Sequence, residues 1–411
     1  MKKVSSLFFL IFVFLLPFNI KFLGYTSSLS NIYSDFNGFF VYPSEFFLLL
    51  SFILFPKSKM IRQQPTSWGT TLLFIGIVFA IPSFFLARDH ILALLAFIRI
   101  LECYFILFLI YHHIAPLYAI LLTLGTSMLG QSILAMVQYS VQHSLGLSFF
   151  GESVMSKETT NIATIDLWGT KILRAYGTFP HPNILGGFLS SIIILFLIFK
   201  DIVQRTIGTW WWRIALLCFM LGLFFTFSRS AILGLFTGFL FLFMLSNRKN
   251  TILLPLVISA LFFIGLSLLF PFFTQRFTAS TTEDTSRMHQ YQVSWMMIQR
   301  HPFGVGLGND TLQLEQEKTT PVSLWDIQPV HNTFLLLTNE IGIIPGIIFL
   351  IFFIFLFYTL ILSPQRVLIA LLSTISVPLV VDHYFYTSFQ GLMLMGMMLG
   401  IIFVQAKRVM L

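Results

Sequence analysis

The chain has 411 residues, of which 57% are hydrophobic and only 10% are charged, and its formal net charge is +8. A soluble domain carries about 25% charged residues, so this composition excludes a water-soluble globular protein and indicates an integral membrane protein. In a membrane protein the excess of Lys and Arg sets topology, and we expect no nucleic-acid partner.

Twelve apolar runs are each long enough to cross the hydrocarbon core of a bilayer as an α-helix. They lie near residues 4–22, 38–56, 68–87, 91–111, 116–141, 184–200, 211–228, 230–247, 251–273, 340–363, 366–382 and 388–406. Transmembrane β-strands would instead alternate in polarity over about 10 residues. The sequence therefore predicts an all-α polytopic transmembrane bundle of about 12 spans, in which residues 1–411 form a single membrane domain.

Lys and Arg gather in alternate connections between these runs. One side holds Lys2, Lys3, Lys57, Lys59, Arg62, Lys200, Arg205, Arg213, Arg248, Lys249, Arg366, Lys407 and Arg408, and the short connections opposite hold only Lys21, Arg88 and Arg229. Because positive charge stays in the cytoplasm, both termini are predicted to be cytoplasmic. We expect a multi-pass protein of the cytoplasmic (inner) membrane with the lipid bilayer as its surroundings.

Two connections are long, and both fall on the extracytoplasmic side of this topology. They span residues 142–183 and 274–332, the latter between spans 9 and 10. Outer loops of this length commonly bind or catalyse. The stretch 151–166 within the first loop is polar and predicts a mobile segment.

The second loop contains a segment with helical periodicity. Its apolar stripe comprises Met288, Tyr291, Trp295 and Ile298. Thr285 or Ser286 is the expected cap and Pro302 the expected end of this helix. We predict an amphipathic helix lying on the outer membrane interface.

Histidines and arginines concentrate on the same outer side. The histidines are His90, His143, His181, His289, His301, His331 and His383, and the arginines are Arg174, Arg229, Arg276, Arg287 and Arg300. Arginine offers a fixed fork of charged donors that matches phosphate oxygens. The pattern predicts a site for a phosphate-bearing lipid headgroup.

Arg229 lies in TFSRSAIL, where two predicted spans meet almost without a loop. A cation at that depth is costly unless it has a partner, so it is either a functional residue or an arginine that extends its head to the interface. Arg287 begins the predicted interfacial helix, and the alternative there is a solvated charge on the polar face.

His331 precedes the apolar run from Glu340 in HNTFLLLTNEIG. A histidine in this position is either a cap or interface residue or a general base, since an ordinary imidazole has a pKa near 6.5. Asn332 is placed to cap the following helix and so hold His331. Glu340 is either its partner or a headgroup contact.

Two further patterns have a structural and a functional interpretation. The alternate glycines of HPFGVGLGN, residues 301–309, predict a flexible turn or a row of backbone donors toward a diphosphate. Arg99 and Glu102 stand three residues apart and predict a neutralising pair within the membrane. The chain contains no Asp-x-Asp, HExxH, CxxC or GxSxG motif, so we expect no metal and no cofactor.

Several of these segments together resemble a known family. They are LRAYGTFPHPNILGGFL (173–189), TFSRSAILGL (226–235), SRMHQYQVSWMMIQRHPFGVGLGN (286–309), HNTFLLLTNEIGIIPG (331–346) and DHYFYTSFQGLMLMGMMLG (382–400). In order and in predicted membrane side they resemble the O-antigen ligase and polymerase superfamily. The first 170 residues are similar to it only in hydropathy.

The resemblance implies a membrane glycosyltransferase of about a dozen helices with a large outer loop. Such an enzyme moves a glycan from a polyprenyl diphosphate carrier, such as undecaprenyl diphosphate, to a hydroxyl of a glycan, lipid or protein acceptor, outside the membrane and without metal. This would be a step in the biosynthesis of cell-envelope polysaccharide.

The resemblance also implies roles for individual residues. Arg229 and Arg287 match arginines that hold diphosphate, and His331 matches the histidine that activates the acceptor; these three are the expected catalytic residues. The expected substrate-binding residues are Arg174, His181, Asn183, Arg300, Gly304 and Gly306.

The expected chemistry agrees with these residue types. A departing diphosphate needs cationic stabilisation, and an attacking hydroxyl needs a base. A polymerase or a protein O-glycan ligase of the same superfamily would carry the same motifs, so both alternatives stay open. A transporter or flippase for lipid-linked sugars is the alternative of another class, although transporters place their polar sites near the bilayer midplane and this chain concentrates them at its outer face.

Overall fold

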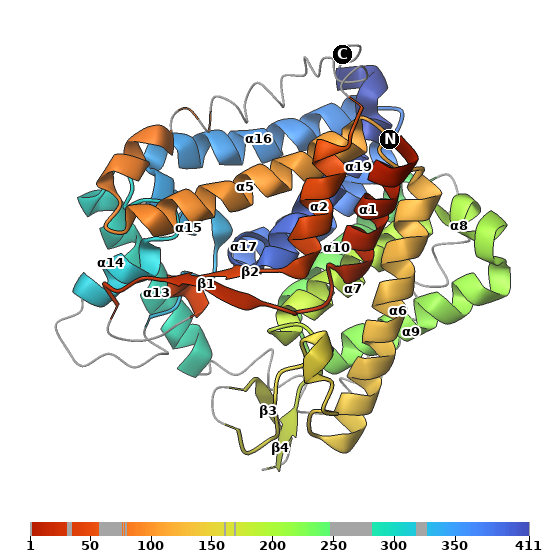
Figure 1. Cartoon of the computed structure of the whole chain (residues 1–411), viewed down its shortest axis with the longest axis horizontal. Coiled ribbons are helices and arrows are strands. Elements are labelled where there is room, and N and C mark those ends of the chain that lie inside the picture. The colour runs from red at the N-terminus through yellow and green to blue at the C-terminus, as the bar shows by residue number, and fades with distance from the viewer. Residues whose placement is uncertain are drawn as a thin grey trace.

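The computed structural model describes residues 2–30, 35–56, 76, 78, 80–159, 162–167, 170–246, 282–317 and 327–410. Over these residues the chain is mostly helical and carries two short antiparallel hairpins (Figure 1). The predicted helical class is confirmed. The predicted span 251–273 and most of the predicted span 68–87 lie outside the described residues.

Five helices of the described residues are long and apolar enough to cross a membrane. They are α5 (His90–Tyr111), α6 (Leu117–Val141), α9 (Thr209–Thr226), α16 (Ile343–Leu362) and α19 (Phe389–Met410, apolar through Ala406). A sixth span results if α7 (Pro182–Ile198) and α8 (Lys200–Ile207), which meet at an 87° bend, are counted together. Three shorter apolar helices of the described residues are α2 (Pro43–Ile53), α10 (Arg229–Leu245) and α17 (Ile369–Val381). The total of twelve spans stays a prediction.

The N-terminal region departs from the predicted spans. Its elements are α1 (Lys2–Leu15), β1 (Phe22–Thr26), the 3-10 turn η1 (Asp35–Asn37), β2 (Gly38–Val41) and α2 (Pro43–Ile53). The predicted spans 4–22 and 38–56 therefore extend too far, because the chain between the two short helices forms a β-hairpin. Hydropathy alone cannot separate an apolar strand from a helix. Pro43 occupies the first turn of α2, where its missing N–H costs no hydrogen bond.

The centre of the bundle is α7. All of its residues except Asn183 and Ile198 are buried, and it packs against α6, α9, α10 and α17. A second pair, α5 and α19, packs alongside, and α1 lies between α2 and α6 (Figure 1). A helix apolar on all sides belongs in such a central position. Both chain ends lie at the same end of the bundle in Figure 1, and their predicted cytoplasmic location stays a prediction.

The two long connections contain ordered elements. The first has the turn η2 (Ser148–Phe150) and the hairpin β3 (Thr164–Leu167) and β4 (Thr170–Leu173), and the second has α13 (Thr282–Arg300) and α14 (Asp310–Glu317). Near the C-terminus follow α15 (Thr333–Ile341), η4 (Arg366–Leu368) and α18 (Tyr384–Thr387). Their placement outside the cytoplasm stays a prediction.

The predicted loop helix exists as α13, with two corrections. It begins at Thr282, so Thr285 and Ser286 lie inside the helix and do not cap it. The predicted stripe also differs in exposure along its length, because Trp295 is 58% exposed whereas Ile298 is 5% exposed. The cause is tertiary packing, since Ile298 lies on the side that faces the neighbouring elements.

The predicted pair in α5 is confirmed. Arg99 Nη1 lies 2.7 Å from Glu102 Oε2 and 2.6 Å from Glu45 Oε1 of α2. The guanidinium also lies 4.3 Å from the ring centroid of Phe39 on β2. Two carboxylates and an aromatic face thus compensate one cation and join α2, α5 and the hairpin.

Candidate active site

A single large cavity opens where the hairpin β1–β2, the β3–β4 loop and the ends of several helices meet. Its volume is about 1810 Å³. Six of the nine expected site residues line it: Arg174, His181, Asn183, Arg229, Arg287 and His331. Residues that are far apart in the sequence therefore share one site in the structure.

The start of α7 carries the first group. Pro182 opens the helix, and the Nδ1 atom of His181 accepts a hydrogen bond from the backbone N–H of Asn183 at 3.1 Å, which caps it. Asn183 then points its amide in two directions. Its Oδ1 accepts from Arg174 Nη2 at 2.6 Å, and its Nδ2 donates to Asp382 Oδ2 at 2.8 Å.

Arg174 is almost fully buried and held at both ends of its guanidinium. Besides the bond to Asn183, its Nε donates to the backbone carbonyl of Thr226 at 2.7 Å. Thr226 is the last residue of α9, where unsatisfied carbonyls attract cations. A guanidinium fixed in this way needs little reorganisation to meet an anion in the cavity.

Arg229 is the first residue of α10, after a connection of only Phe227 and Ser228. Phe227 adopts the left-handed conformation with φ of 49°, and the Ser228 hydroxyl accepts from the backbone N–H of Ala231 at 3.4 Å. The predicted close meeting of two spans is thus present. It brings the half-buried Arg229 to the cavity wall beside the end of α9.

His331 is oriented by α13. Its Nδ1 lies 2.9 Å from Gln290 Oε1, and its backbone carbonyl accepts from Tyr291 Oη at 3.3 Å. Because an amide oxygen can only accept, this hydrogen bond requires the tautomer that carries its proton on Nδ1. Asn332 caps α15 by accepting from the N–H of Leu335 at 3.0 Å, which confirms its predicted role. Arg287, one turn before Gln290 on the same helix, also lines the cavity.

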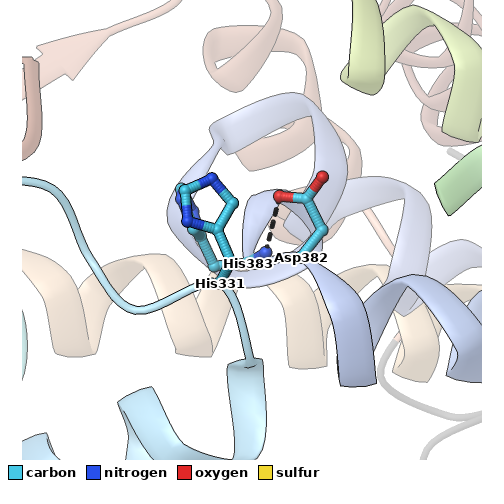
Figure 2. Close-up of side chains that lie close together, drawn as sticks. All are labelled: His331, Asp382 and His383. Atoms are coloured by element: carbon cyan, nitrogen blue, oxygen red, sulfur yellow. Dashed lines mark hydrogen bonds between the residues drawn. The ribbon is translucent and has the colours of Figure 1, made fainter. Parts of the chain in front are cut away.

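Two residues that sequence analysis did not assign to the site complete this cluster. Asp382 and His383 follow α17, and together with His331 they offer three ligand atoms that lie within 4.8 Å of one another (Figure 2). The His331 and His383 rings meet edge to face with centroids 5.0 Å apart. The backbone N–H of His383 donates to Asp382 Oδ1 at 2.9 Å. The available signal was an Asp-His pair directly after an apolar run, which also fits a simple helix end.

Two of the histidines are kept neutral by their surroundings. Burial lowers the pKa of His181 to about 3, with a further decrease from the charge of Arg174. Burial likewise lowers the pKa of His383 to about 3, and His331 and Arg287 act in the same direction against the opposing charge of Asp382. These rings act as neutral hydrogen-bonding groups at neutral pH.

Two imidazoles and one carboxylate are also a donor set that a divalent transition-metal ion accepts. The Nδ1 of His383 already contacts Thr387 Oγ1 at 2.8 Å, and that of His331 contacts Gln290. The second nitrogen of each ring and the carboxylate of Asp382 would be the ligands.

The other three expected residues do not line the cavity. Arg300 Nη1 donates to Glu317 Oε2 at 2.9 Å in an exposed pair. The N–H of Gly304 donates to His301 O at 2.9 Å, and that of Gly306 to Glu340 O at 2.8 Å, so neither amide is available to a diphosphate. The glycines have φ of 85° and 99°, and a Cβ on Gly306 would collide with Ala87. They therefore serve a tight turn, which is the first of the two interpretations given above.

Comparison with known proteins identifies part of the chain. Residues 214–351 match the family model described as O-antigen ligase. No curated protein is similar to the chain. The matched segment contains Arg229, Arg287 and His331, and the resemblance seen in the sequence is confirmed.

Proposed function

We propose that this chain, a multi-pass membrane protein that its residues 214–351 assign to the O-antigen ligase superfamily, is a membrane glycosyltransferase. It would move a glycan from a polyprenyl diphosphate carrier to an acceptor hydroxyl at the outer face of the membrane, without a metal ion. The observation that carries the proposal is the convergence of Arg174, Arg229, Arg287 and His331 on one cavity.

The arginines supply what a diphosphate leaving group needs. As the bond between the anomeric carbon and the diphosphate oxygen breaks, negative charge develops on that oxygen. Arg174, Arg229 and Arg287 come from three separate parts of the chain, and all line the cavity. Arg174 is already fixed by Asn183 and Thr226, and donors fixed in advance stabilise developing charge most effectively.

His331 supplies the base. Its Nε2 would take the proton of the acceptor hydroxyl as that oxygen forms the new bond to the anomeric carbon. The proton then resides on the imidazole, which Gln290 continues to orient through Nδ1. The carrier departs as the polyprenyl diphosphate anion, so no strong acid is required.

The test is glycan transfer by purified full-length protein in detergent. We expect Arg229→Ala, Arg287→Ala and His331→Ala each to lose about 10²–10³ in kcat while the protein still inserts in the membrane. Arg300→Ala is the matched control on the helix of Arg287, since its guanidinium pairs with Glu317 outside the cavity. Near-normal transfer by a cavity variant would remove that residue from the active site.

The same assay separates the alternatives. Transfer in detergent, where no compartments exist, would exclude transport as the sole activity. Transfer that persists in EDTA supports a metal-free reaction, whereas loss that a divalent ion restores would make His331, Asp382 and His383 a metal site. In a deletion strain, glycans that stop at one repeat would indicate a polymerase, and full-length glycans left on the carrier would indicate a ligase.

A further inference from the structure

The wall of the cavity contains two buried acids that the proposed reaction does not use. Asp310, the first residue of α14, and Glu340, near the end of α15, are 2% and 4% exposed, and both line the cavity. The glycine turn holds them in place, because the N–H of Gly306 donates to Glu340 O and that of Val305 to Asn339 O at 2.9 Å. A diphosphate-binding surface has no evident need for buried carboxyl groups.

One oxygen of this pair lacks a partner. Asp310 Oδ1 accepts from Asn339 Nδ2 at 2.9 Å, but Oδ2 has no hydrogen-bond partner among the described residues. The same is true of Oε1 of Gln390, which is fully buried on the first turn of α19 and lines the same cavity. Buried polar atoms are nearly always satisfied in folded proteins, so these two call for a ligand that donates hydrogen bonds.

Burial raises the pKa of Asp310 to about 7, and the hydrogen bond from Asn339 opposes that rise only in part. At neutral pH the carboxyl group is therefore able to accept a hydrogen bond in one protonation state and to donate one in the other. Hydroxyl groups match such a residue well, because each hydroxyl also both donates and accepts.

The acids lie on the His331 side of the cavity. Thr311, next to Asp310, donates to Asn37 Oδ1 of η1. The neighbouring Phe36 ring makes a T-shaped contact with the His383 ring at a centroid distance of 5.6 Å. His383 in turn contacts His331.

A second connection leads to the same side. Tyr386, one turn after His383 on α18, donates its hydroxyl to Glu340 Oε2. Arg174 instead reaches the cluster from the other direction, through Asn183 and Asp382. These contacts thus run in order from the arginines proposed to bind the diphosphate, through the histidines, to the acids.

We propose that Asp310 and Glu340, with Phe36 beside them, form a subsite that binds the hydroxyl groups of a sugar acceptor. The inference rests on the proposed function and names the acceptor class. Carboxyl groups would repel the diphosphate of the donor, whereas they bind sugar hydroxyls. Phe36, which lines the same cavity, would add an apolar contact to a sugar ring. A site built around hydrogen bonds to hydroxyls rejects acceptors that lack them.

The test measures two ligands on full-length protein in detergent by calorimetry. The probes are inorganic diphosphate and the glycan portion of the unmodified acceptor, isolated from the envelope of the deletion strain. Asp310→Asn retains an oxygen that accepts from Asn339 but replaces Oδ2, the oxygen without a partner, by an NH₂ group. We expect this variant to bind glycan about 10- to 100-fold more weakly, which corresponds to the loss of one charge-assisted hydrogen bond. Phe36→Ala should weaken it as well. Neither variant should change diphosphate binding.

Two matched variants complete the design. Arg287→Gln should weaken diphosphate binding and spare glycan binding, and Glu317→Gln, an acid of the same helix as Asp310 that does not line the cavity, should spare both. Wild-type glycan affinity in both Asp310→Asn and Phe36→Ala would overturn the subsite. A different result would overturn the proposed function: the wild-type protein neither binds diphosphate nor transfers glycan. If Asp310→Asn and Phe36→Ala still lost glycan binding in that case, the subsite would be upheld.

Discussion

The orientation of His331 by Gln290 leads to a quantitative prediction. The contact is one partly buried hydrogen bond, at 2.9 Å. Such a bond contributes about 0.5–1.5 kcal/mol net, and at an RT of about 0.59 kcal/mol this corresponds to roughly 2- to 13-fold. Gln290→Leu, which keeps the size but removes the acceptor, should therefore lower kcat for glycan transfer about 3- to 10-fold. His331→Ala should cost far more, because it removes the base itself.

A second substitution tests the direction of the effect. Gln290→Glu retains an acceptor for Nδ1–H, so transfer should persist. The added carboxylate stabilises the protonated imidazole, and the neutral ring that acts as a base then forms only at higher pH. The acid limb of the pH–rate profile should accordingly move to higher pH. Gln290→Leu should reduce the plateau without this displacement.

The assay is steady-state transfer over pH 5 to 9 with purified protein in detergent. Gln292→Leu is the matched control, since Gln292 is an exposed glutamine of the same helix. Equal kcat values for Gln290→Leu and the wild type would refute the orienting role. A loss as large as that of His331→Ala, in a variant with an unchanged melting temperature, would show that Gln290 itself takes part in the chemistry.

Two further predictions concern stability. Gly306→Ala should destabilise the protein by about 1–3 kcal/mol in thermal unfolding, because its Cβ would collide with Ala87 and φ there is 99°. Gly130→Ala is the control and should not destabilise it, since a Cβ there meets nothing within 4 Å. Equal melting temperatures of the two variants would contradict this packing. His181→Asn keeps a capping side chain but removes a ring whose pKa falls to about 3 on folding. Between pH 6.5 and 3 the imidazole of His181 is protonated in the unfolded chain but not in the folded one, so the wild type loses stability as pH falls. The variant should lose less. Melting temperatures of the two proteins that fall in parallel with pH would contradict this.

Hydropathy was sufficient for the helices that lie in continuous apolar runs. The predicted spans 91–111 and 116–141 correspond to α5 and α6 within a residue or two. It was insufficient where the same composition folds differently. The runs at 4–22 and 38–56 include the strands β1 and β2, and 340–363 is interrupted at Gly342, whose φ of 94° separates α15 from α16. Residue composition does not encode these breaks, because they depend on packing against distant segments.

In the candidate site, too, the sequence predicted some residues and missed others. Arg229, Arg287 and His331 could be named from the sequence, because each stands in a segment that resembles the O-antigen ligase and polymerase superfamily. Their relation to Asp382 and Asp310 could not, since it arises only when α7, α14 and α17 meet around one cavity. Single acids at helix ends are common, so nothing local distinguished these two.

The cavity combines segments inside and outside the part of the chain that matches O-antigen ligase. Arg229, Arg287 and His331 lie within residues 214–351, whereas Phe36 belongs to the N-terminal hairpin. If all members of a family use a diphosphate leaving group, all of them need residues that stabilise its negative charge. An acceptor wall contributed by a hairpin is under no such requirement, because in the proposed reaction other residues bind the diphosphate. On this reasoning, substitutions in η1 should alter which acceptors are used, and substitutions of the arginines should reduce transfer to all of them.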